Sequence, residues 1–202
     1  MRNTKLAVLG VAALTMTLAT GCAKPPQVEI DAAKAKLAAA EAEASKYASD
    51  AYNAAQQKMN EVNAEVEAQA NKFALFRSYT KTKELVAAAD SAAQQAADQA
   101  VSGKEAARVA ANDGLTAAKA SLDQASILMT ELAACRRQPK DFRKDMEAMK
   151  GTLDGYMAQV AGIEGAIASE DFLGAKSQAD NLKSSVDTLV TDLQGAKEKI
   201  NC

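Results

Sequence analysis

Apolar and polar positions alternate in steps of three and four from about residue 28 to 132, the spacing of helices that pack along one side. Two apolar series follow each other, and the second is one step out of phase with the first. The shift falls at Ser49-Asp50, residue types favoured at a helix start. The pattern predicts a helix over about 27–48 that kinks into another over about 50–72. The series are Ile30, Ala33, Leu37, Ala40, Ala44 and Tyr47, then Tyr52, Ala55, Met59, Val62, Val66, Gln69 and Phe73.

A turn is expected over 71–80, and a third series then runs from Tyr79 to Ala100. Another one-step shift follows, near the capping-box pattern Ser102-Gly103-Lys104-Glu105. If the chain reverses near residue 74, antiparallel partners sum to about 149, so the two shifts face each other. We therefore expect one long, kinked helical hairpin over 30–134, and leave open whether it is broken near 49 and 102.

The last third keeps the same spacing from Met146 to Ile167 and from Phe172 to Ile200. The connection between them offers Ser169 or Asp171 as an N-cap. This pattern predicts a second hairpin, 140–202, packed on the base of the first. The expected fold is all-α: long antiparallel hairpins in an elongated bundle or coiled coil, with four helices at the base and two above.

The start of the chain has the layout of an export signal: two basic residues, a mostly apolar stretch over 6–18, then small residues before Cys22. The apolar stretch has about 13 residues, fewer than the roughly 20 that span a bilayer. The run Leu18-Ala19-Thr20-Gly21-Cys22 resembles a bacterial lipobox, although Leu is more usual where Ala19 stands. We expect a signal peptide over 1–21, lipid on Cys22 and a linker over 22–29. The alternative is an ordinary secreted protein in which Cys22 is incidental.

Ala23 follows the expected lipidated residue, where Asp would favour retention at the inner membrane. The expected location is thus the outer membrane, with the chain facing the periplasm. Lipid on Cys22 would leave Cys135 and Cys202, an even pair in an oxidising compartment. Folding the second hairpin about residue 169 brings Cys202 near Cys135, so we expect a disulfide between them. Two unpaired thiols are the alternative. All three cysteines would then lie at one end, with the turn over 71–80 at the other.

Composition adds mainly exclusions. Hydrophobic residues make up 48% of the 202 residues but aromatics only 4%, and the many alanines predict thin helix seams. The chain has no histidine, which removes the commonest general base and metal ligand. It also lacks CxxC, P-loop, GxGxxG and GxSxG motifs, so we expect no enzyme, cofactor or metal site. The formal net charge of −2 is spread over both signs, which argues against nucleic-acid binding.

One aromatic cluster stands out at the expected turn: Phe73, Phe76, Arg77 and Tyr79, with Leu75 between them. Its rings could fill the end of the first hairpin or pack on the second. They could instead contact a partner protein, since exposed aromatic and arginine side chains are favoured anchors in interfaces.

The run Cys22-Ala23-Lys24-Pro25-Pro26, followed by Glu29 to Lys34 and Tyr47 to Tyr52, resembles a helical domain of unknown function in bacterial envelope lipoproteins. The resemblance covers about residues 22–130, and Ser49 stands where that family usually has Pro. Some members carry an OmpA-like peptidoglycan-binding domain after it. Here a helical hairpin is expected instead, so peptidoglycan binding does not carry over. The resemblance implies no catalytic residues.

We therefore expect a membrane-anchored periplasmic lipoprotein with a noncatalytic structural or adaptor role, acting through helix–helix contacts. An envelope protein or a second copy of the chain would be its partner. The alternative is a carrier of lipid or a small apolar ligand, in which Met146, Met149 and Met157 line the site.

Overall fold

The computed structural model describes residues 24–136 and 138–201, and within them the chain is all-α, as predicted. These residues form five α-helices, and a short 3₁₀ turn lies in the connection between the second and the third. The elements are α1 (Gln27–Tyr47), α2 (Ser49–Ala70), η1 (Ala74–Phe76), α3 (Thr80–Ala134), α4 (Phe142–Ala168) and α5 (Phe172–Lys199).

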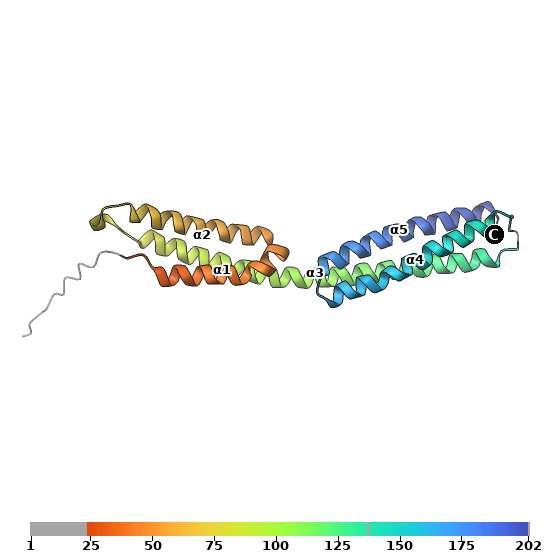
Figure 1. The fold of residues 1–202 in the computed structure, drawn as a ribbon, viewed down its shortest axis with the longest axis horizontal. Helices are drawn as coiled ribbons and strands as arrows, with labels where there is room; N and C mark the ends of the chain where they lie inside the picture. Colours follow the sequence, from red (N-terminus) through yellow and green to blue (C-terminus); the bar gives the residue numbers. More distant parts are fainter. Residues whose placement is uncertain (1–23, 137, 202) are drawn as a thin grey trace, which may run out of the picture.

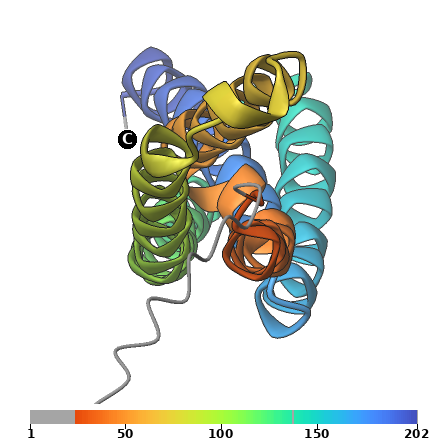
Figure 2. The same ribbon diagram turned by 90° about the vertical axis from the view of Figure 1, so that its left-hand side faces the viewer.

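Helix α3 is the shared spine of an elongated rod (Figure 1). Its 55 residues span about 80 Å at 1.5 Å per residue. Helices α1 and α2 flank its first half, and α4 and α5 flank its second half. Viewed along the rod, the two pairs lie one behind the other (Figure 2). The molecule is thus two three-helix bundles placed end to end on one continuous helix.

The first phase shift is a chain reversal, which corrects the expected kink. Ile30 of α1, Met59 of α2 and Val86 of α3 share one buried cluster. A kinked rod would separate the first two by about 40 Å, since they lie 29 residues apart. The only residue between the helices is Ala48, at φ −148° and ψ 46°. Ser49 begins α2 without a side-chain capping bond, so the expected cap is not formed.

The second phase shift lies inside α3, which runs unbroken through Ser102 and Gly103. Ala100 belongs to a buried cluster with α1 and α2, whereas Ala107 belongs to the cluster formed with α4 and α5. The shift therefore marks the place where α3 changes partners. The capping-box pattern has no cap to form there, and the Ser102 hydroxyl donates to the carbonyls of the preceding turn.

The α4–α5 hairpin packs on the second half of α3 rather than beside α1 and α2. Because α1 ends at the reversal, each half of the rod is three helices thick, and the expected base of four helices does not form. Asp171 is the N-cap of α5 and accepts a hydrogen bond from the Gly174 amide at 3.3 Å. The largest side chains that are almost completely buried in this bundle are Leu132, Ile163, Leu182, Leu193 and Val186.

The first bundle is held mainly by alanine, as the composition suggests. Such small side chains let the helices approach closely along thin seams. The buried alanines of this first bundle are Ala33, Ala40, Ala44, Ala55, Ala89, Ala93, Ala96 and Ala100.

None of the described helices is both long and apolar enough to cross a membrane.

Candidate functional site

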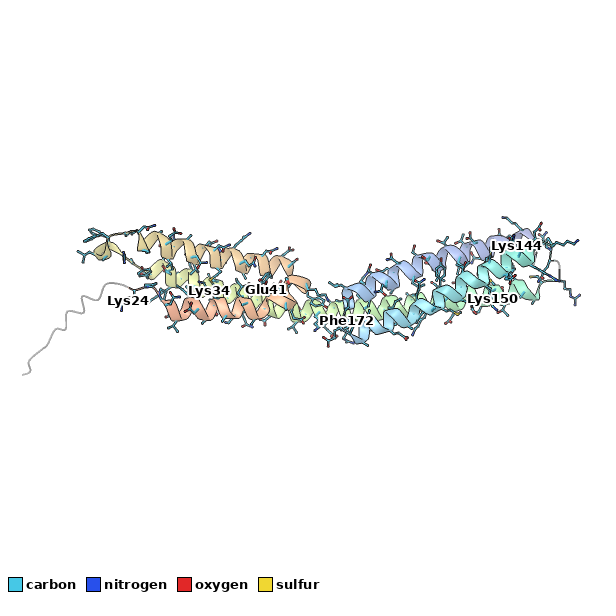
Figure 3. All side chains as sticks on the ribbon, viewed as in Figure 1. Lys24, Lys34, Glu41, Lys144, Lys150 and Phe172 are labelled. Atoms are coloured by element: carbon cyan, nitrogen blue, oxygen red, sulfur yellow. The ribbon has the colours of Figure 1, made fainter. Side chains whose placement is uncertain are left out.

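The start of α1 and the connection between α2 and α3 lie at the same end of the rod (Figures 1 and 3). Helices α1 and α3 run parallel, since Ile30 packs with Val86 and Ala44 with Ala100. Lys24, labelled in Figure 3, therefore lies at the same end of the rod as the aromatic cluster, while Cys135 lies at the far end of α3. The start of α1 is thus at the end of the rod away from Cys135, whereas the expected single hairpin would have placed it beside Cys135 and opposite the aromatic turn.

Residues 71–79, here called the aromatic loop, expose most of their apolar side chains. Phe73 is 68% exposed, Leu75 81% and Phe76 75%, whereas Tyr79 is buried at 7%. The two phenylalanine rings lie 6.3 Å apart between centroids. The rings of Phe73 and Phe76 thus neither fill the end of the bundle nor pack on α4 and α5. Only Tyr79 takes the packing role.

Polar contacts fix the shape of the loop. Arg77 donates from Nε to the Lys72 carbonyl at 2.9 Å and from a terminal nitrogen to the Ala70 carbonyl at 2.8 Å. The Ser78 amide donates to the Gln69 side chain at 3.1 Å. Arg77 therefore braces the end of α2, where carbonyls lack partners within the helix.

Buried Gln69 is itself held by Glu65, which accepts from its Nε2 at 2.7 Å. Lys81 of α3 lies 3.0 Å from the same carboxylate. The hydrogen bonds from Gln69 and then Lys81 lower the pKa of Glu65. This network joins both ends of the aromatic loop to α2 and α3.

The sequence of the loop and of the first residues of α3 is basic. Residues 71–83 contain Lys72, Arg77, Lys81 and Lys83 and no acidic residue. The loop thus combines an apolar projection with positive charge, part of which Glu65 of α2 offsets through its ion pair with Lys81.

Two predicted site residues, Cys22 and Cys202, lie outside the described residues. Cys135 is disulfide-bonded. The end of α5 lies next to it: Lys197 pairs with Glu131 at 2.6 Å, and Ile200 packs against the C-terminal core. This geometry is compatible with the predicted Cys135–Cys202 bond, whose pairing stays a prediction.

The middle of the rod, where the turn after α1 meets the turn between α4 and α5, carries a charged cluster. Lys104 of α3 lies 2.7 Å from Glu170 and 3.1 Å from Glu43. Hydrogen bonds to Glu170 and then Glu43 raise the pKa of Lys104, and the bond from Lys104 lowers that of Glu170. Glu170 adopts the left-handed conformation, at φ 61°. We call this meeting place, with Tyr47, the waist.

Grooves run along the rod, and the three methionines do not share one. A groove of about 580 Å³ between α3 and α4 is lined by Met146 and Met157, together with Met129 and Leu153. Met149 borders a separate hollow of about 220 Å³ between α4 and α5. A third groove, of about 670 Å³, lies at the waist and is lined by alanines, Lys104 and Arg108. Each is open along the surface.

No family model, curated protein or solved structure matches this chain. Function must therefore be argued from its own residues. Within 24–136 and 138–201, no three His, Cys, Asp or Glu side chains gather in a way that could hold a metal ion.

Sequence reasoning missed the close contact at the waist. A Cβ on Gly103 would lie closer than 3.0 Å to the Tyr47 carbonyl oxygen, so only glycine fits there. The four glycines of α4, at 151, 155, 162 and 165, have open space where a Cβ would lie. The sequence feature that indicates this contact is the position of Gly103 beside the second phase shift.

Proposed function

We propose that this chain is a lipid-anchored, periplasm-facing protein of the bacterial outer membrane with a noncatalytic structural or adaptor role. The observation that carries the anchor is the run Leu18-Ala19-Thr20-Gly21-Cys22 after a short apolar stretch. The rod supports the adaptor role, because one continuous helix keeps two bundles at a fixed separation. Its ends can then engage different structures, the membrane at one and a protein at the other.

The anchor is tested by growing cells with a clickable palmitate analogue and comparing two substitutions. Cys22→Ala should abolish labelling of the chain and leave the export signal uncleaved. Cys135→Ala is the matched control and should keep the label, since this cysteine lies in a disulfide at the distal end. Labelling that survives Cys22→Ala would refute the anchor.

The adaptor role is tested by photo-crosslinking in intact cells. A photoreactive amino acid would be placed at exposed Ile127 or at Leu173, on different elements of the C-terminal bundle. A discrete crosslinked protein, or a crosslinked dimer of this chain, is expected from at least one position. If neither gives a discrete product at native expression, the adaptor role is wrong.

A carrier of lipid or a small apolar ligand is the second candidate. The groove between α3 and α4 favours it, because α4 buries fully only Phe142, Leu153 and Ile163 along 27 residues. Native mass spectrometry after mild extraction should then show one lipid in addition to the anchor. Met146→Lys, which places a charge in the groove, should remove that lipid. A mass that equals the anchored chain alone would exclude the carrier.

A further inference from the structure

The aromatic loop exposes more apolar surface than the fold requires. Both phenylalanines that are not buried in the C-terminal core lie in it, three residues apart, with Leu75 between them. Removing such side chains from water is favourable. Other exposed apolar residues, such as Val101 and Ile127, stand singly on helix faces, which is ordinary for a protein surface.

The position of the aromatic loop in the rod indicates what it contacts. Lys24 lies at the loop end of the rod, and two residues of chain reach at most about 7 Å. The chain before Lys24 therefore begins at the loop end of the rod. A lipid on Cys22 would place a bilayer surface directly beside the exposed rings, at a high local concentration.

Charge favours a lipid surface. Basic residues flank the rings in sequence: Lys72 and Arg77 lie within the loop and Lys81 and Lys83 at the start of α3, where Lys81 pairs with Glu65. Apolar side chains flanked by basic residues suit a bilayer interface, where phosphates lie just above the acyl chains. The bonds from Arg77 and Gln69 hold the loop in shape before contact, so little ordering is needed when it binds.

We propose that the aromatic loop is a second membrane-binding element, which inserts Phe73, Leu75 and Phe76 into the interface of the bilayer that holds Cys22. The proposal rests on lipid attachment at Cys22. With two contacts at one end, the rod stands away from the membrane and carries the C-terminal bundle outward. A second contact with the bilayer fixes the orientation of the rod, which a flexible tether at Cys22 alone would leave free.

The chain contains no tryptophan, so a single substitution supplies a unique fluorescent probe. Phe76→Trp is made in the full-length, lipidated chain and reconstituted into phosphatidylethanolamine–phosphatidylglycerol vesicles. Emission should shift to the blue, and brominated phospholipids should quench it at least twofold. Val101→Trp is the matched control, at 73% exposed but in the middle of the rod, and it should show neither effect.

Two further measurements decide between occupants of the loop. Phe73→Ser/Leu75→Ser, added to the Phe76→Trp chain, should reduce the quenching to the level of the Val101→Trp control while the helical circular dichroism stays unchanged. A photoreactive residue at position 75 in cells should crosslink phospholipid. Crosslinking to a protein alone, or water-like emission of the Phe76→Trp chain in vesicles, would overturn the proposal.

Palmitate labelling of the same preparations separates this inference from the proposed function. A labelled chain with a water-exposed loop would overturn the inference and leave the anchor standing. An unlabelled chain whose loop is quenched by added vesicles would overturn the anchor, and with it the shared bilayer, while showing that the loop itself inserts into lipid.

Discussion

Gly103 offers a direct test of how the two bundles are joined. A Cβ at this position would lie closer than 3.0 Å to the Tyr47 carbonyl oxygen and 3.2 Å from the carbonyl carbon. The obstructing atoms are backbone, so no rotamer change relieves the clash. Gly103→Ala must push the end of α1 away from α3.

Two opposing effects set the magnitude. Alanine in place of glycine inside a helix stabilises by about 1 kcal/mol, whereas overpacking typically costs about 1–3 kcal/mol. The matched control is Gly155→Ala in α4, where a new Cβ meets nothing within 4 Å. That variant keeps the gain in helix propensity without the clash. The difference between the two variants should therefore be about 1–3 kcal/mol, with Gly155→Ala the more stable.

Gly114 provides an intermediate point, because a Cβ there would lie 3.2 Å from the Ala179 Cβ, a tight contact with a side chain. Urea unfolding followed by circular dichroism at 222 nm should rank the variants Gly155→Ala, Gly114→Ala and Gly103→Ala from most to least stable. If Gly103→Ala gains as much stability as Gly155→Ala, α1 does not contact α3 at the waist as described.

Three further substitutions test the packing and its pH dependence. Thr82 is fully buried and its hydroxyl has no hydrogen-bond partner among the described residues, so Thr82→Val should raise the unfolding free energy by about 1 kcal/mol; a loss would mean that the hydroxyl is satisfied. Leu182→Ala should lower the unfolding free energy by about 2–5 kcal/mol, and a loss below 1 kcal/mol would contradict its burial. Hydrogen bonds from Lys183 and then Ser121 lower the pKa of Asp187 from its usual 3.8. Its stabilising contribution is therefore complete above that value and is lost as pH falls through the lower folded-state pKa. Asp187→Asn should flatten the acid limb of the stability curve, and an unchanged limb would refute this role.

The presence of the helices could be predicted from the sequence, because seam spacing depends only on which side chains are apolar. The direction of each helix relative to the one before it could not be predicted. A one-step shift in the seam arises when a residue such as Ala48 leaves the helix and the chain reverses. It also arises when a continuous helix, such as α3 between Ala100 and Ala107, turns a new face to new partners. The pattern of apolar residues is the same in both cases, so it cannot tell a reversal from a change of partners.

The sequence predicts where the aromatic loop lies in the chain, but not which of its side chains are exposed to water. Phe73 continues the seam of α2 in phase, which predicts burial, yet α2 ends at Ala70 and the seam ends with it. Tyr79 begins the next seam and is buried as that pattern implies. Which aromatic side chain faces water thus depends on where α2 ends, and helix ends are poorly encoded when no proline or glycine marks them.

The orientation of the rod follows from counting reversals. Each reversal inverts the chain direction, so one turn before α3 would put the chain start at the far end of this helix from the aromatic loop. Two turns, at Ala48 and at the loop, make α1 and α3 parallel and bring the start of α1 to the loop end of the rod. A tether at Cys22 would then leave the C-terminal bundle as the free end, about 80 Å of α3 away. That bundle has the larger core and a disulfide at its tip, and its α4 is only partly covered. Under the proposed function, a protein partner is therefore expected at the C-terminal bundle, and the aromatic loop is left to the membrane.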